Sequence, residues 1–126
     1  MIIELNKKSF DSVIAQDGIV LIRCWASWCQ SCEEDAEAFR TAAAKFPEHV
    51  FSTLDTDAER EICSALNIVH IPCLLLFRDS LLLLKQAGSF DETALDDIVA
   101  QAESLSMDEV NAALSSAMEE TGAGAP

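Results

Sequence analysis

The sequence predicts an α/β fold, in which strands and helices alternate through one domain and a further helix follows it. Two observations predict this class. Short apolar runs alternate with amphipathic segments along the chain, a pattern typical of strands followed by helices. The chain also has 126 residues, half of them hydrophobic, which is enough to bury one core without cross-links.

The first half of the chain is predicted to contain strands separated by helices. The apolar run at 19–25 is interrupted only by Arg23, as expected of a central strand covered on both faces. The helix after it ends before Pro47, because the residue preceding a proline is disfavoured in a helix. In chain order we expect a short edge strand at 1–5, a helix at 9–16, a strand at 19–25, a helix at 29–46 and a strand at 50–54.

The second half of the domain is predicted to contain a hairpin between two helices. Asn67 closes the first of these helices, Pro72 precedes the hairpin, and Gly88 ends it. The expected elements are a helix at 58–66, strands at 73–77 and 81–85 joined by a turn at 78–80, and a helix at 91–102.

A further helix is predicted beyond the domain, which covers residues 1–103. Ser106 and Glu109 fit the capping-box pattern of a helix start. Apolar residues then recur at helical spacing, which indicates an amphipathic helix within 104–120, followed by a flexible tail at 121–126. The apolar stripe either packs on the sheet or the preceding helix, or it docks a partner or a second subunit. It consists of Met107, Val110, Leu114, Ala117 and Met118.

The net charge of −14 argues against nucleic acid and anionic membrane surfaces as partners. The charge is also unevenly distributed. No Lys or Arg follows Lys85, whereas nine Asp or Glu residues lie between Asp91 and Glu120. This acidic surface serves either solubility or the steering of basic partners toward the protein.

Cysteine usage and the apolar stretches predict a cytoplasmic protein. The five cysteines are an odd number and the N-terminus does not have the pattern of a signal peptide, so a reducing compartment is expected. The richest apolar stretch, at 71–84, is interrupted by Arg78 and Asp79, and its pieces are far shorter than a membrane span.

Cys29 and Cys32 form a Cys-x-x-Cys pair where a strand pattern gives way to a helical one. Two thiols so spaced can close a small disulfide ring and open it again, which indicates thiol–disulfide exchange rather than a structural staple. The thiolate is the attacking species, and a helix N-terminus lowers the pKa of a thiol. Cys29 is therefore predicted as the exposed nucleophile, and Cys32, one turn further along, as the resolving cysteine.

Three local patterns together resemble the thioredoxin family: Trp25-Ala-Ser-Trp28-Cys29-x-x-Cys32, the Ile71-Pro72 dipeptide before an apolar strand, and Gly88 before the last helix of the domain. The resemblance covers about residues 1–103. It implies the thioredoxin fold, with a central mixed sheet of four to five strands flanked by helices. It also implies a cis peptide bond before Pro72, and contacts with substrate at Trp28, Ile71, Pro72 and Gly88.

The residues between and beneath the two cysteines depart from the family pattern. Gln30-Ser31 replaces the common Gly-Pro, which implies a weaker reductant than a housekeeping thioredoxin. Arg23 replaces a buried Asp that helps to move the proton of the resolving cysteine, and Thr53 stands for its Lys partner. An arginine cannot accept that proton. It either stabilises a thiolate directly or turns to solvent or pairs with an acid.

Other polar residues near the pair have less specific patterns. His70 lies where the family often has Gly, and it either assists proton transfer or has a structural or substrate-contacting role. The acids at 33–35 complement the dipole of the helix. Glu37 replaces a proline that kinks this helix in the family, so a straighter helix is expected.

The three remaining cysteines are expected to be mainly packing residues. Cys24 and Cys63 are predicted as small buried hydrophobes. Cys73, after the proline, is either buried like them or close enough to the active pair to exchange disulfides or bind metal. A four-thiolate site on Cys29 and Cys32 would need two more cysteines, so no metal or other cofactor is expected.

The leading functional hypothesis is a thiol–disulfide oxidoreductase that acts on protein disulfides in cell redox homeostasis. Its electron donor would be a partner that resembles thioredoxin reductase. The alternative is a binding module of the same fold, whose C-terminal helix recruits partners and whose cysteine pair is regulatory or vestigial.

Overall fold

A five-stranded mixed sheet forms the centre of the molecule. The computed structural model describes the backbone of residues 2–124 and the side chains of residues 2–115. The strand order is β1-β3-β2-β4-β5; β1, β3 and β2 are parallel, and β4 and β5 are antiparallel to their neighbours. The predicted mixed sheet is confirmed. The strands are β1 (Ile2–Glu4), β2 (Ile19–Trp25), β3 (Val50–Asp55), β4 (Cys73–Arg78) and β5 (Leu81–Ala87).

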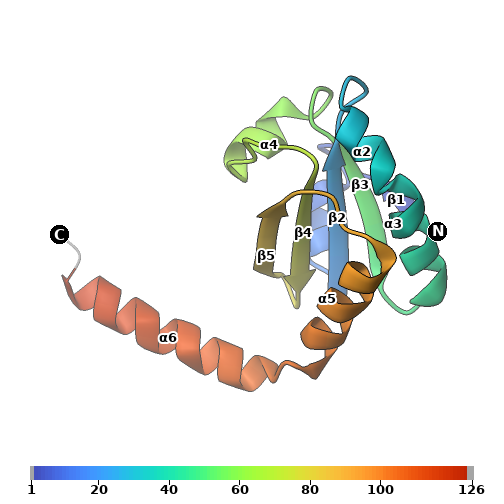
Figure 1. The fold of residues 1–126 in the computed structure, drawn as a ribbon. Helices are drawn as coiled ribbons and strands as arrows, with labels where there is room; N and C mark the ends of the chain where they lie inside the picture. The colour runs from blue at the N-terminus through green and yellow to red at the C-terminus, as the bar shows by residue number, and fades with distance from the viewer. Residues whose placement is uncertain (1, 125–126) are drawn as a thin grey trace.

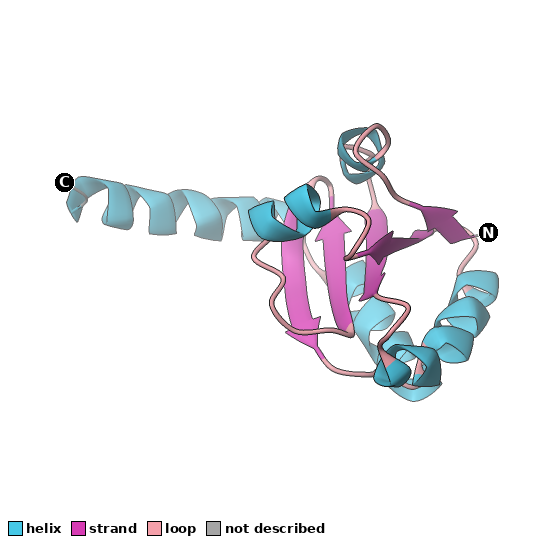
Figure 2. Ribbon diagram, turned by 90° about the horizontal axis from the view of Figure 1, so that it is seen from above, coloured by secondary structure: helices cyan, strands magenta, loops and turns pink. Residues whose placement is uncertain are grey.

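Helices cover both faces of this sheet (Figures 1 and 2). One face packs against α1 and α4, and the opposite face packs against α3 and α5. The helices are α1 (Phe10–Ile14), α2 (Gln30–Glu34), α3 (Ala36–Lys45), α4 (Arg60–Ala65), α5 (Glu92–Ser104) and α6 (Met107–Gly124).

The central strand β2 divides the core into two halves. Its side chains alternate, so that Val20 and Ile22 belong to the core on the α1 face, whereas Ile19 and Leu21 belong to the core on the α3 face. Leu21 and Ile22 are fully buried. Burying each such side chain contributes about 1.5–3 kcal/mol, and this burial fixes the strand that carries the cysteine pair at its end.

The predicted hairpin of β4 and β5 is confirmed, and it has a tight two-residue turn. Asp79 and Ser80 adopt φ angles of 51° and 71°. Positive φ at both central residues is typical of the turns that match the twist of a hairpin. The carboxylate of Asp79 also accepts a hydrogen bond of 2.8 Å from the N–H of Gly18, which ties the turn to the start of β2.

The predicted straight helix at 29–46 is wrong in one respect, because Asp35 separates α2 from α3. Its backbone N–H bonds to the Glu33 carbonyl, rather than to the carbonyl four residues back. Its side chain is buried instead of exposed. The interruption therefore lies at an acid that turns inward, two residues before Glu37.

The C-terminal helix α6 projects away from the body of the molecule (Figure 1). The Ser106 hydroxyl accepts a hydrogen bond of 3.3 Å from the N–H of Glu109, which is the serine half of the predicted cap. Leu114 is 42% exposed. The part of the apolar stripe whose side chains are described therefore does not pack on the sheet. The other two residues of the stripe, Ala117 and Met118, lie beyond the described side chains. The helix reaches Gly124 and includes part of the segment predicted as a tail.

No helix in the part of the chain that the structure describes is both long and apolar enough to cross a membrane.

Candidate functional site

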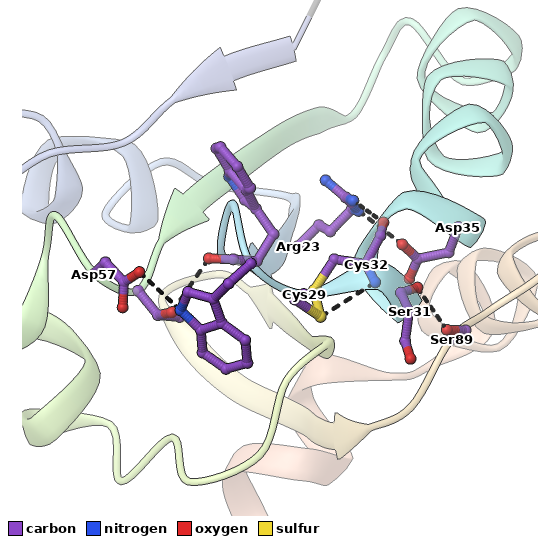
Figure 3. The surroundings of a disulfide bond; sticks show 10 residues. Arg23, Cys29, Ser31, Cys32, Asp35, Asp57 and Ser89 are labelled. Carbon is purple, nitrogen blue, oxygen red and sulfur yellow. Dashed lines mark hydrogen bonds and ion pairs between the residues drawn. A yellow bond between two sulfur atoms is a disulfide. The ribbon is translucent and has the colours of Figure 1, made fainter.

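Cys29 and Cys32 form a disulfide at the end of β2, where the chain enters α2 (Figure 3). Their Cα atoms are 5.3 Å apart. Cys29 is the N-cap residue of α2, and its sulfur accepts a hydrogen bond of 3.2 Å from the N–H of Cys32. A sulfur that accepts an N–H at a helix start is in a setting that favours the thiolate once the disulfide opens.

Both cysteines are covered more than the sequence suggests. Cys29, expected to be exposed, is 7% exposed, and Cys32 is 1% exposed. They form a small cluster with Ala26, and the side chains of Trp25 and Ile71 pack against it. Cys29 remains the more accessible of the two, as a nucleophile that meets an incoming chain must be.

The Ile71-Pro72 peptide bond is cis, as the resemblance implies. The carbonyl of Pro72 accepts a hydrogen bond of 2.8 Å from the N–H of Gly88, which has a φ of 123° that favours glycine. The following residue, Ser89, donates its hydroxyl to the carbonyl of Ser31 at 3.1 Å. The loop before α5 therefore contacts both the proline segment and the dipeptide between the cysteines.

Trp28 is the most prominent exposed residue beside the pair. It is 67% exposed, and its indole Nε1–H donates a hydrogen bond of 2.9 Å to Asp57 Oδ2 (Figure 3). Asp57 follows β3, and nothing in its local sequence marks it as a site residue. The bond holds an aromatic ring in a fixed orientation next to Cys29, where an incoming chain could lie against it.

Arg23 is buried beneath the pair and pairs with an acid. Its Nε donates to Asp35 Oδ1 at 2.9 Å, and its Nη2 donates to the carbonyl of Cys32 (Figure 3). It does not turn to solvent. Thr53 lies opposite it in the sheet register, as the family correspondence implies. The guanidinium thus connects the central strand to the backbone of Cys32 and to the junction between α2 and α3.

Asp35 is the functional candidate that sequence reasoning missed. The sequence groups it with Glu33 and Glu34 as an acid that complements the helix dipole. In the structure those two side chains are exposed, whereas Asp35 is buried. The signal in the sequence is its spacing. Asp35 follows Cys32 by three residues, so it lies on the same inward face of the helix, above the strand position of Arg23.

A cavity of about 540 Å³ opens beside this ion pair. Its lining includes Arg23, Cys32, Trp25, Thr53 and Arg40, drawn from β2, α2, α3 and β3. Solvent can therefore approach the buried side of Cys32, and His70 does not line this cavity.

His70 lies in the segment between α4 and β4, two residues before Pro72. It is exposed, and it lines a second cavity together with Cys73 and Lys85 rather than the cavity beside Cys32. Gln30 and Ser31 are also exposed, so their side chains are open to an incoming partner.

The three other cysteines are free and buried, as expected of small core residues. Cys24, Cys63 and Cys73 all belong to the core on the α1 face of the sheet. The described residues contain one group of three side chains close enough to share a metal ion, and it consists of Glu48, His49 and Glu103. It includes none of the cysteines.

Comparison with known proteins places this site in a family. The family model described as Thioredoxin matches residues 1–101. The putative thioredoxin 2 of Streptomyces coelicolor is 36% identical over 120 residues, which are 95% of this chain and 90% of that protein. Thioredoxin C-3 of Corynebacterium nephridii is 39% identical over 75 residues, covering 59% of this chain and 52% of that protein.

Solved structures agree on the fold. A mutant thioredoxin from Halobacterium salinarum NRC-1 has a TM-score of 0.76 and 24% identity, and the match covers 83% of this chain and 93% of that one. The fold, the disulfide at the start of α2 and the cis-proline therefore occur together with a match to the family model over most of the chain. The chain belongs to the thioredoxin family, and it is a thiol–disulfide oxidoreductase in that general sense.

Proposed function

We propose that this protein reduces disulfide bonds of other proteins through a mixed disulfide, with Cys29 attacking and Cys32 resolving. The observation that carries the proposal is the position of the two sulfurs. Cys29 caps α2 and accepts the N–H of Cys32, whereas Cys32 is almost fully buried behind it. Only Cys29 has the accessibility that an intermolecular attack requires.

In the first step the Cys29 thiolate attacks one sulfur of a substrate disulfide. A bond forms between Cys29 and that sulfur, the substrate disulfide breaks, and the other substrate sulfur leaves as a thiolate that takes up a proton. In the second step the Cys32 thiolate attacks Cys29 Sγ, which closes the Cys29–Cys32 disulfide and releases the second substrate thiol. Two electrons have then passed to the substrate, and a dithiol donor of the thioredoxin-reductase type returns them.

The surface around Cys29 provides the contacts for the substrate chain. We propose that the Trp28 ring lies against it on one side, and that Ile71, Pro72 and Gly88 contact it on the other. Trp28 is exposed and fixed by Asp57, which supports this arrangement because a fixed aromatic ring loses little conformational entropy on binding.

Arg23 and Asp35 are proposed as positioning residues for Cys32. The family usually places a buried carboxylate on β2, whereas this chain has the cation there and a buried carboxylate on the neighbouring helix. Because Arg23 also donates to the Cys32 carbonyl, the pair holds the backbone of the resolving cysteine against the sheet. A guanidinium is unable to take the proton of Cys32 at physiological pH, so that proton leaves by another route.

The test is insulin-disulfide reduction with three single variants. Cys29→Ser should abolish turnover, because no nucleophile remains. Cys32→Ser should also stop turnover but accumulate the mixed disulfide on Cys29, which is visible on a non-reducing gel. The matched control, Cys63→Ser, removes a buried thiol outside the pair and should retain activity. Wild-type activity in Cys29→Ser would overturn the mechanism.

A second candidate function, a binding module, is favoured by the projecting helix α6. Its described apolar side chains are partly exposed, and no basic residue follows Lys85. A module need not cycle between dithiol and disulfide within the physiological range of potentials, so a redox titration of the Cys29–Cys32 pair separates the two functions. We place the oxidoreductase in the cytoplasm, where the three free buried thiols would stay reduced.

A further inference from the structure

Cys24 and Cys73 form a second pair of thiols, apart from the active site. They are directly opposed in the antiparallel ladder of β2 and β4. Directly opposed residues point to the same face of a sheet. Their Cα atoms are about 4.5 to 5.5 Å apart in such ladders, which is within the range of roughly 4.4 to 6.8 Å that disulfides span. Backbone geometry therefore permits a bond between these sulfurs without moving either strand far.

The two thiols interact with each other and differ in their surroundings. A hydrogen bond with Cys24 is the main cause that lowers the pKa of Cys73 to about 7; burial opposes this change, whereas the Lys85 cation and the Gln86 N–H assist it. The same hydrogen bond, followed by burial, raises the pKa of Cys24 far above its usual range. The Lys85 cation and the Gln86 N–H both favour a thiolate on Cys73, which is also the less deeply buried of the two residues.

Cys73 also has access to solvent that Cys24 lacks. It lines a cavity of about 280 Å³ at the surface, together with Lys85 and His70. The Lys85 ammonium is held there by the carbonyls of Leu66 and Asn67, at 3.2 and 3.1 Å. Cys24 is fully buried. A small reagent in this cavity would meet Cys73 first, and Cys24 would lie directly behind it.

We propose that Cys73 and Cys24 are a second redox-active dithiol, which a small hydroperoxide oxidises to a cross-strand disulfide. The cavity has room for a reagent of this size. The proposal goes beyond protein-disulfide reduction, since it needs neither a protein substrate nor the Cys29–Cys32 pair.

The chemistry balances with hydrogen peroxide as the oxidant. The Cys73 thiolate attacks one peroxide oxygen and the O–O bond breaks, which gives a sulfenic acid on Cys73 and hydroxide. The hydroxide takes up the proton that the Cys73 thiol had released and becomes the first water. The Cys24 sulfur then attacks the Cys73 sulfur, the S–O bond breaks, and the proton of the Cys24 thiol leaves with the hydroxyl group as water. Two thiols and one peroxide thus give one disulfide and two waters.

Cys63 is the competing partner for Cys73. It lies on α4 in the same core, and burial followed by the charges of Asp55 and Glu59 raises its pKa. It has no register partner in the sheet, and its interaction with Cys73 is through charge alone, without the hydrogen bond that joins Cys24 and Cys73. Cys24 is therefore the resolving thiol.

The first experiment uses the unmodified protein with its Cys29–Cys32 disulfide closed, so that the active pair does not react. Three thiols per chain are then free. Brief treatment with hydrogen peroxide, followed by thiol titration in denaturant, should leave one, and peptide mapping should recover a fragment that links Cys24 to Cys73. Three thiols remaining, or a link from Cys73 to Cys63, would overturn the proposal.

Two sets of variants test the assigned roles. Cys24→Ser should let the sulfenic acid on Cys73 accumulate and react with dimedone, whereas Cys63→Ser should form the same disulfide as the unmodified protein. Lys85→Gln should slow iodoacetamide alkylation of Cys73 near neutral pH by roughly two- to tenfold, since a nearby cation favours the thiolate. Lys8→Gln removes the same charge from another exposed site and should leave the rate unchanged. Equal slowing in both variants would contradict the role of Lys85, and a dimedone adduct on Cys24 would contradict the order of attack.

Discussion

Arg23 and Asp35 illustrate how single residues can depart from a family pattern and still form a complementary arrangement. The strand position that commonly holds an acid holds a cation, and the helix above it supplies the carboxylate. A buried ion pair is costly to break, because removing one partner leaves an unpaired charge in the core. Replacing both partners by apolar residues is far less costly.

We therefore expect Asp35→Leu to destabilise the protein by about 3–5 kcal/mol, whereas Arg23→Met combined with Asp35→Leu should recover most of that loss. Urea denaturation measures both changes. Lys45→Met is the control, because its ion pair with Asp96 is exposed and is worth less than about 1 kcal/mol. An undiminished loss in the double variant would show that the carboxylate has a role other than balancing Arg23.

The positioning role of the same pair has a separate readout. Arg23→Lys keeps the charge but loses the fork that reaches both Asp35 and the Cys32 carbonyl. Turnover of insulin disulfides should fall, and the mixed disulfide on Cys29 should persist longer, because the resolving step is the one that needs Cys32 in place. Trapping of that intermediate by acid quench measures its lifetime. A shorter or unchanged lifetime would separate Arg23 from the resolving step.

At the scale of elements, α2 and its N-cap are the part of the fold that carries the redox pair. Cys29 is the N-cap of this five-residue helix, and the exposed Gln30-Ser31 dipeptide and Cys32 lie in its first turn. A proline between the cysteines would remove one backbone N–H near the sulfurs and restrict the chain.

The double substitution of Gln30→Gly with Ser31→Pro should make the Cys29–Cys32 pair more reducing. The measured quantity is the reduction potential at equilibrium with glutathione, which should become more negative. A substitution at an exposed position distant from the pair, Lys8→Gln, serves as the control. An unchanged or less negative potential would contradict the expectation, drawn from the family resemblance, that this dipeptide makes the protein a weaker reductant.

None of the side chains described for the helix α6, at 107–115, is buried in the core. The guanidinium of Arg78 binds the carbonyls of Ala102 and Leu105, which fixes the end of α5, whereas α6 projects beyond this point (Figure 1). Because 95% of the chain matches the Streptomyces coelicolor relative, that match extends into the residues of α6. The helix is thus part of a likeness that goes beyond the family model.

Truncation after Ser106 should leave the thermal midpoint within about 2 °C of that of the full chain, because the described side chains of α6 are not buried. A loss of 1 kcal/mol of stability would move the midpoint of a domain of this size by roughly 2–8 °C. Insulin reduction should also be retained. Truncation after Ser104 is the comparison, because it additionally removes the Leu105 carbonyl that Arg78 binds, and it should lower the midpoint further. Only the chain that ends at Ser104 should lose much stability. A large loss in the chain that ends at Ser106 as well would mean that α6 packs on the domain.

At the scale of the whole molecule, the net charge of −14 is the feature that we expect to act on encounters with substrates. Long-range fields steer oppositely charged partners, and salt screens them over about 8–10 Å. Reduction of a disulfide peptide rich in Lys and Arg should therefore slow as salt increases, whereas reduction of an acidic peptide should accelerate. Initial rates at two ionic strengths test this. The same salt dependence for both peptides would show that the field plays no part in recognition.

Much of this molecule follows from local patterns in the sequence. The apolar runs determine the strands, the tight turn at Asp79 and Ser80 determines the hairpin, and the Cys-x-x-Cys spacing determines the redox pair. These features depend on neighbours in the chain, so periodicity and turn chemistry predict them. The cis bond at Ile71-Pro72 was also predictable, because the family resemblance implies it, and the structure contains it.

The tertiary structure decided what depends on residues distant in sequence. Arg23 could face solvent, a thiolate or an acid, and only the packing of the helix over β2 selects Asp35 as its partner. In the same way, the opposition of Cys24 and Cys73 follows from the register of β2 against β4, which no local pattern specifies. The sequence by itself determined a thioredoxin-family redox pair. The ion pair of Arg23 and Asp35 beneath it, and the second pair of thiols, became visible only in the fold. The reason is that contacts between distant segments are set by packing and register.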